Sequence, residues 1–161
     1  MEYKAIETFY DGYRFRSRLE ARWAYVFKTL GISYQYESEW FQMSTGHQYC
    51  PDFKVIMPNA VKPYTKKDYF WIEIKGSKFM GMDKAKVEAF SKEYAKETYV
   101  LVLIGNLPNG TKIERYVYIY GDLFKHDFIH SPFPNDLTKA CGGFEKIHIA
   151  FAKAMYYKFK E

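Results

Sequence analysis

The sequence predicts a mixed α/β fold in which α-helices flank a β-sheet. In some segments apolar residues recur at three- and four-residue steps, which is typical of helices. In others they alternate with polar residues or run unbroken, which is typical of strands. The two kinds of segment follow one another along the chain, as expected for a sheet covered by helices. A length of 161 residues without a visible linker or repeat favours a single domain over 1–161.

The N-terminal third is expected to hold one helix and two strands. Residues 15–30 place leucine, tryptophan and phenylalanine on one helical face, and a glycine follows as a stop signal. Residues 33–37 indicate a short strand. Residues 48–55 indicate another, interrupted by Pro51. Proline lacks an amide donor, so this second strand is expected to lie at a sheet edge or to bend there.

The middle of the chain contains the clearest strands. After a polar loop over 59–68, residues 69–75 alternate strictly and predict a strand. One face of it would carry Phe70, Ile72 and Ile74, and the other Trp71, Glu73 and Lys75. A helix is expected over 83–97, and the unbroken apolar run 99–104 predicts a strand covered on both faces.

The last third is less regular. Glycines at both ends of 105–110 indicate a turn, and 114–120 predicts a further strand. The stretch 121–143 shows no clear period and is left unassigned. Residues 144–160 predict a final helix, because apolar side chains recur there at four-residue intervals.

Composition narrows the function classes. The net charge is +5, from 24 Lys and Arg against 19 Asp and Glu, which fits a polyanionic partner such as DNA without requiring one. Aromatic residues form 20% of the chain and would either stack on bases or fill the core. No apolar run reaches the roughly 18 residues of a membrane helix, and no secretory signal opens the sequence. We therefore expect a soluble, cytoplasmic protein with no membrane partner.

Three residues have the chemistry of a divalent-cation site. Glu73 and Lys75 share one face of the predicted strand 69–75, and Asp52 follows Pro51 on the preceding strand. Hard cations such as Mg²⁺ prefer carboxylate oxygens. A neighbouring lysine would position or deprotonate an attacking water, or stabilise negative charge on a phosphate.

These residues also resemble a known family. Pro51-Asp52, followed after twenty residues by Glu73-Ile74-Lys75, is similar to the signature of the PD-(D/E)xK nuclease superfamily. Residues 13–24 resemble the acid-bearing first helix of many small phage and bacterial nucleases of that superfamily. The resemblance covers 13–104 and implies a restriction-endonuclease-like core, a mixed sheet flanked by helices.

The resemblance also implies catalytic roles. Asp52 and Glu73 would hold Mg²⁺ or Mn²⁺, with the backbone carbonyl of Ile74 as a further oxygen ligand. Glu20 would reach the metal directly or through a water. Lys75 would orient the attacking water or stabilise the transition state. The implied activity is metal-dependent endonucleolytic hydrolysis of phosphodiester bonds in DNA.

Simpler interpretations remain open for each residue. In the simpler interpretation, Glu20 forms an ion pair with Arg16, four residues earlier on the same helix, and holds no metal. Glu73 and Lys75 likewise form an exposed ion pair on the sheet surface. Several basic residues near the motifs would either contact phosphates or lie on a solvated face. The candidate DNA-binding residues are Arg14, Arg16, Arg18 and Lys78.

Two other function classes also remain. The first is a DNA-binding or scaffold protein that kept the nuclease fold but lost catalysis. The second is a nuclease that acts on RNA. For a DNA nuclease, cutting both strands of a duplex needs two active sites, which favours a homodimer. A chain of this length leaves little space for a sequence-reading domain, which favours recognition of DNA structure or targeting by a partner protein.

Overall fold

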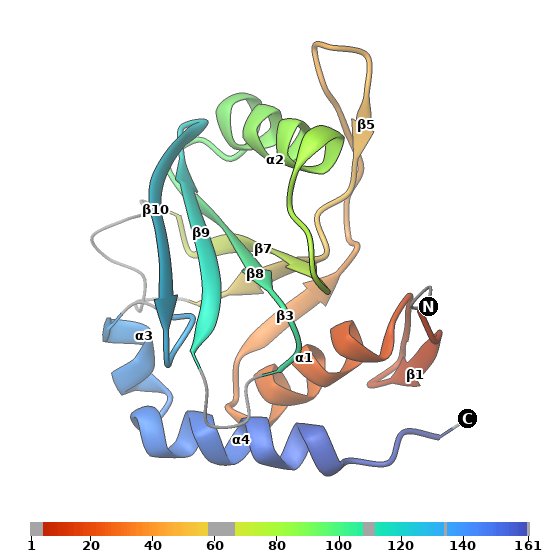
Figure 1. Ribbon diagram of the computed structural model, residues 1–161, viewed down its shortest axis with the longest axis vertical. Coiled ribbons are helices and arrows are strands. Elements are labelled where there is room, and N and C mark those ends of the chain that lie inside the picture. Colours follow the sequence, from red (N-terminus) through yellow and green to blue (C-terminus); the bar gives the residue numbers. More distant parts are fainter. Residues whose placement is uncertain (1–4, 58–66, 108–111, 134, 161) are drawn as a thin grey trace.

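The computed structural model describes residues 5–57, 67–107, 112–133 and 135–160. Its centre is a six-stranded mixed sheet in the order β10-β9-β8-β7-β6-β3 (Figure 1). The parallel pair is β7 with β8, and the other neighbours run antiparallel. The strands are β3 (Ser33–Tyr36), β6 (Phe53–Ile56), β7 (Tyr69–Lys75), β8 (Tyr99–Ile104), β9 (Ile113–Ile119) and β10 (Asp122–Ile129). The predicted mixed α/β class with helices flanking a sheet is confirmed.

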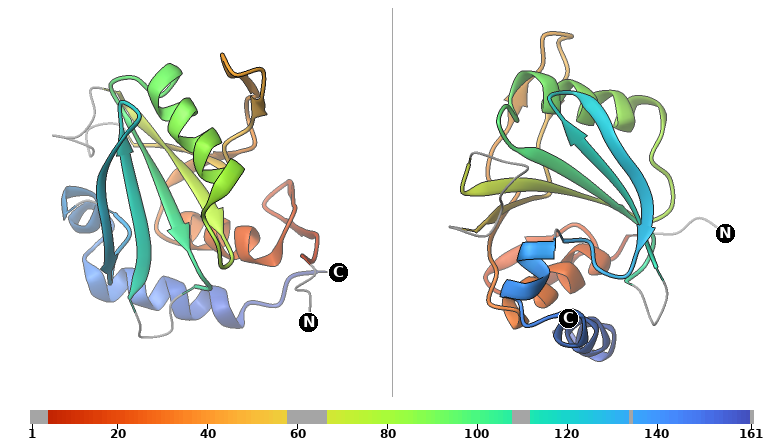
Figure 2. Two further views of the ribbon diagram at one scale, coloured as in Figure 1. Left: turned by 45° about the horizontal axis from the view of Figure 1, so that its top comes forward. Right: turned by 90° about the vertical axis from the view of Figure 1, so that its left-hand side faces the viewer.

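Helices cover both faces of this sheet (Figure 2). They are α1 (Arg18–Thr29), α2 (Gly81–Glu93), α3 (Asn135–Ala140) and α4 (Phe144–Tyr156). On one face, α1 and α4 bury Phe27 and Phe151 with Ile72 of β7. On the other, α2 buries Phe90 with Trp71 of β7. Successive residues of β7 thus enter opposite cores, which confirms the predicted alternation.

The first helix begins later than predicted, because Ser17 caps it. The Ser17 hydroxyl accepts a hydrogen bond from the Glu20 amide at 3.1 Å and satisfies a free donor of the first turn. The three residues assigned in error to the helix start, 15–17, include the end of a hairpin. This hairpin, β1 (Thr8–Tyr10) and β2 (Tyr13–Phe15), was not predicted. Its signal was Asp11-Gly12, a two-residue turn with both φ angles positive.

The strand predicted over 48–55 is two strands, divided at Pro51. β5 (Gln48–Tyr49) pairs with β4 (Phe41–Gln42) in a separate hairpin that was not predicted. β6 lies inside the main sheet, between β3 and β7, so the edge-strand alternative is wrong and the bend alternative is right. The pairing of Phe53 with Ile72, continued by two residues, sets Pro51 opposite Ile74. Proline has no amide to extend the ladder, and the pairing ends there.

The remaining elements differ from prediction mainly at their ends. The strands over 69–75 and 99–104 are confirmed, and α2 and α4 end four residues before the predicted 97 and 160. The unassigned stretch 121–143 contains β10 and α3. Most side chains of β10 are exposed at the sheet edge, and a register shift between Leu123 and Lys125 breaks its alternation. The expected loop over 59–68 lies largely outside the described residues, and of the expected turn over 105–110 the structure describes 105–107.

Candidate active site

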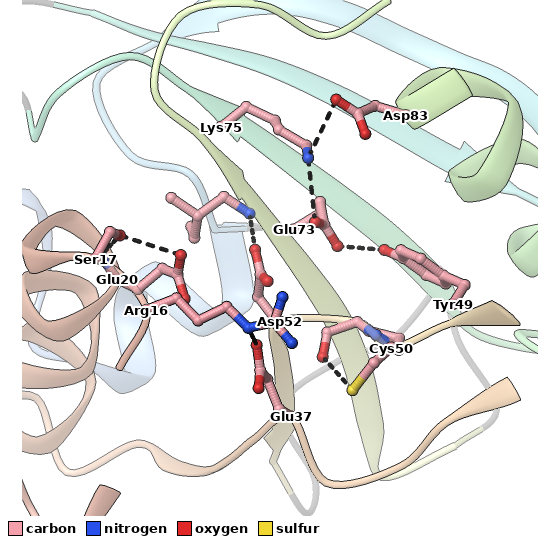
Figure 3. A network of polar contacts seen from close by, with 12 residues as sticks. Arg16, Ser17, Glu20, Glu37, Tyr49, Cys50, Asp52, Glu73, Lys75 and Asp83 are labelled. Carbon is pink, nitrogen blue, oxygen red and sulfur yellow. Dashed lines mark hydrogen bonds and ion pairs between the residues drawn. The ribbon is translucent and has the colours of Figure 1, made fainter. Parts of the chain in front are cut away.

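A polar pocket of about 270 Å³ lies where β6 begins and β7 ends, beside the first turns of α1 and α2 (Figure 3). We call it the acid pocket. Its walls include all four predicted catalytic side chains, which come from two separate elements, α1 and β7, and from the segment between β5 and β6. These are Glu20, Asp52, Glu73 and Lys75.

Asp52 is held by the backbone of the neighbouring strand. Its Oδ2 atom accepts a hydrogen bond from the Ile74 amide at 2.8 Å. The regular pairing of β6 with β7 ends at Phe53 and Ile72, so this amide lies just beyond the paired residues. There the aspartate side chain is the acceptor that satisfies it. The sequence Pro51-Asp52 thus fixes a carboxylate at the rim of the sheet.

Glu73 and Lys75 lie on the α2 side of β7, as Trp71 does. Glu73 is 5% exposed and accepts a hydrogen bond from the Tyr49 hydroxyl of β5. The Lys75 ammonium lies 3.6 Å from Glu73 Oε1 and 3.5 Å from Asp83 Oδ2 in the first turn of α2. The β5 strand and α2 therefore fix the orientation of both motif side chains. The alternative of an exposed pair is wrong for Glu73, which is buried.

Glu20 points from α1 toward Asp52 (Figure 3). The Ser17 hydroxyl donates to Glu20 Oε1 at 3.1 Å, and the Tyr36 hydroxyl donates to Oε2. Arg16, the alternative partner of Glu20, instead pairs with Glu37 through an Nε–Oε1 distance of 2.6 Å. Glu20 is thus oriented by two neutral hydroxyls.

Glu37 belongs to the same pocket and was not predicted. Its amide donates to the Asp52 carbonyl at 2.9 Å, which continues the antiparallel pairing of β3 with β6 by one residue. Oxygen atoms of Glu20, Glu37 and Asp52 lie within 4.8 Å of one another. The available signal was an acid directly after the strand that pairs with the Pro51-Asp52 strand. Tyr49 and Asp83 were missed because neither stands in a motif.

The carboxylates of Asp52, Glu73 and Glu20 are costly to ionise together, because they are buried or half-buried and repel one another. Burial raises the pKa of Asp52 well above its usual range, and the carboxylates of Glu73 and Glu20 add to the rise. Burial also raises the pKa of Glu73 and of Glu20, although their hydrogen bonds oppose it. For Lys75, burial would lower the pKa, but Glu73, Asp83 and Asp52 outweigh it and raise the pKa. Lys75 is therefore a cation at neutral pH.

The donor set fits a divalent cation. Several carboxylate oxygens converge on one small pocket, and a hard cation there would relieve the repulsion that raises their pKa values. Oxygen atoms of Asp52, Glu20 and Glu37 approach one another most closely, and Glu73 is near enough for its charge to raise the pKa of Asp52. The Ile74 carbonyl as a ligand stays a prediction.

The predicted DNA-binding residues do not lie together. Arg16 lines the acid pocket, as does Lys86 of α2. Arg14 is exposed, pairs with Glu7 and lies 5.8 Å over the Phe9 ring of the β1–β2 hairpin. Arg18 is half-buried at the start of α1, and Lys78 is exposed between β7 and α2, outside the pocket lining. Contacts of these side chains with DNA stay predictions.

In comparisons with known proteins, no family model, no curated protein and no solved structure matches the chain. Among the described residues, no helix is both long enough and apolar enough to cross a membrane. The function must therefore be inferred from the geometry of the acid pocket.

Proposed function

We propose that this chain is a metal-dependent endonuclease of the PD-(D/E)xK class that hydrolyses phosphodiester bonds in DNA. The observation that carries the proposal is the meeting of Asp52, Glu73 and Lys75 in one pocket with Glu20. The proline and the aspartate fall at the end of the β6–β7 ladder, and the acid and lysine end β7. A short sequence pattern arises by chance, but convergence of its members in space is a stricter test.

The order of elements also supports a restriction-endonuclease-like core. An acid-bearing helix, α1, precedes the strand that follows Pro51-Asp52, and β7 carries Glu73 and Lys75. Helix α2 then crosses to β8, which lies parallel to β7 inside the sheet. This is the order and context that the motif resemblance requires, over most of the chain from α1 to β8.

Each side chain then has a defined task. Asp52 and Glu73 would hold Mg²⁺ or Mn²⁺, with Glu20 and Glu37 directly or through water. The bound cation would polarise the scissile phosphate and lower the pKa of a coordinated water. Lys75, kept protonated between Glu73 and Asp83, would stabilise the additional negative charge of the transition state. Tyr49 and Tyr36 would hold the carboxylates of Glu73 and Glu20 in orientation.

A cleavage assay tests the proposal. The purified chain is incubated with linear, supercoiled and branched DNA and with RNA, in Mg²⁺, Mn²⁺ or EDTA. Glu73→Gln and Lys75→Met are compared with the matched surface variants Glu145→Gln and Lys96→Met. Both control residues are exposed and lie outside the acid pocket. Metal-dependent cutting that only the pocket variants lose is the expected result.

Other outcomes would favour the alternatives. Cutting of RNA alone would keep the chemistry but change the substrate. DNA binding without cutting in any metal would indicate a silent DNA-binding protein. Cutting that survives both pocket substitutions would place the active site elsewhere.

The predicted homodimer needs a separate test, which is sedimentation of the chain with and without duplex DNA. A protein partner that targets the chain to DNA is likewise a proposal.

A further inference from the structure

A second cavity, of about 390 Å³, lies on the opposite side of the sheet from α2. We call it the apolar cavity. Residues of β8, β9 and β10 form its floor, and Phe133 and Phe144, which lie before and after α3 in the chain, also line it. Its volume falls within the roughly 300–1,000 Å³ of small-molecule sites. None of its lining residues belongs to the acid pocket.

Strand register explains the composition of the floor. Leu101 pairs with Val117, and Val117 pairs with Lys125, so these three side chains point to one face. The bulge after Leu123 lets Phe124 join the same cavity, although it precedes Lys125 directly. The Lys125 ammonium lies 5.5 Å from the Phe124 ring centre. The floor is thus an apolar surface with a cation at its outer edge.

The charged groups that line the cavity all have one sign. They are Lys112, Arg115 and Lys125, and none of the described lining residues is acidic. Arg115 is 8% exposed and is neutralised by Asp127, through Nε–Oδ1 at 3.0 Å and Nη2–Oδ2 at 2.8 Å. The net positive charge at the mouth therefore comes from the two lysines, whose side chains are exposed.

Tyr99 supplies a second, independent observation. It lines the cavity, it is 1% exposed, and its ring stacks on Phe70 at 4.7 Å. Its hydroxyl has no hydrogen-bond partner within the part of the chain that the structure describes. A buried hydroxyl without a partner is unfavourable, and a ligand with an acceptor group would satisfy it.

From these observations we infer that the apolar cavity binds a small organic anion: an apolar body carrying one carboxylate or phosphate group. The apolar body lies on Leu101, Val117 and the phenylalanine rings, and the anionic group faces Lys112 and Lys125. The Tyr99 hydroxyl donates to a polar atom of the ligand. This inference does not depend on the proposed nuclease activity.

Fluorescence titration with 8-anilinonaphthalene-1-sulfonate, an aromatic anion, tests the inference on the full chain. Dodecanoate and adenosine 5′-monophosphate are then added as competitors, each beside its neutral analogue, dodecanol or adenosine. We expect the dye to bind saturably and to be displaced by one of the two anions but not by its neutral analogue. The anion that competes shows whether the apolar body of the natural ligand is aliphatic or aromatic.

Variants locate the binding. The double variant Lys112→Gln/Lys125→Gln removes both exposed charges without changing the core. It is expected to weaken binding at least about tenfold, which corresponds to the loss of one charge-assisted hydrogen bond. Lys96→Gln, an exposed lysine beyond α2, is expected to have no effect. Tyr99→Phe is expected to weaken binding severalfold while DNA cleavage is unchanged. Equal affinity in the double variant and the wild type, equal competition by neutral analogues, or no saturable binding would each overturn the inference.

Discussion

The acid pocket and the apolar cavity are built on neighbouring strands of one sheet, yet they treat charge in opposite ways. In the acid pocket, buried carboxylates face one another, and their pKa values rise. In the apolar cavity, the buried Arg115 is matched by Asp127 and also donates to the Pro132 carbonyl at 3.0 Å. The first arrangement is unfavourable until a cation arrives, whereas the second is already satisfied in the folded chain.

Under the proposed function, this difference separates a site that carries out chemistry from a wall that holds the fold together. Like charges that are buried close together lower stability, and they persist where function needs them. A matched buried pair does the reverse, because loss of one partner leaves the other without compensation. Substitutions in the two regions should therefore change activity and stability in opposite directions.

The largest effect is expected on catalysis. Glu73→Gln keeps the size of the side chain and its contact with Tyr49 but removes the charge that would hold the cation. Cleavage should fall by about 10²–10³-fold or more. The fall is measured by comparing single-turnover cleavage rates of the variant and the wild type at saturating Mn²⁺. A loss below tenfold would mean that Glu73 is not a principal ligand.

In the apolar cavity, Arg115→Met should destabilise the fold and leave cleavage intact. Loss of a fully buried partner costs about 3–5 kcal/mol, and we expect about 2 kcal/mol here because the Asp127 side chain is 31% exposed. Chemical denaturation measures it. Arg115→Met/Asp127→Leu should recover part of the loss, and equal instability of both variants would show that packing, not charge, dominates.

Asp52→Asn should change stability in the opposite direction to Arg115→Met, because it should stabilise the metal-free fold. The folded-state pKa of Asp52 is raised, so its contribution to stability is greatest below the unfolded pKa and is lost as pH rises through the folded pKa. The amide keeps an acceptor for the Ile74 amide but has no charge to bury. In EDTA we expect a gain of about 1 kcal/mol at pH 8 and almost none near pH 4.

The same variant tests the cation site. Mn²⁺ or Mg²⁺ should raise the melting temperature of the wild type, because a ligand that binds the native state stabilises it. Asp52→Asn should lose most of that shift. A melting temperature that rises equally in both proteins would place the cation outside the acid pocket.

A loss of DNA affinity without loss of the cation is expected at the rim of the acid pocket. Trp40 lines this pocket and is 61% exposed, so its ring is free to stack on a base. Trp40→Ala should weaken DNA affinity about tenfold. Its metal-induced thermal shift should match that of the wild type. Tyr156→Ala, which removes an aromatic ring 79% exposed on α4, is the control and should bind DNA normally.

Sequence periodicity predicted the buried half of the fold well. Strands β7 and β8 follow their apolar patterns to the residue, because burial on one or both faces dictates those patterns. Strand β10 escaped prediction because edge exposure and a bulge remove that constraint. The two short hairpins escaped because their turns, not their apolar residues, define them.

The candidate site shows the same division. Asp52, Glu73 and Lys75 lie in a recognisable spacing, and the structure brings them together as predicted. Glu37 and Asp83 reach the pocket through strand pairing and through the approach of α2, which no local spacing encodes. The apolar cavity has no sequence signature at all, since its walls combine three strands with the chain around α3.

One hydrogen bond gives the molecule a built-in reporter. The Ile74 amide proton is bonded to a carboxylate oxygen of Asp52, so the electron density around that proton follows the charge on the carboxyl group. Protonation, deprotonation or cation capture at Asp52 should each shift a single backbone resonance in a ¹⁵N-labelled sample. Titration of that resonance would follow the state of the acid pocket without a substrate, a dye or a substitution.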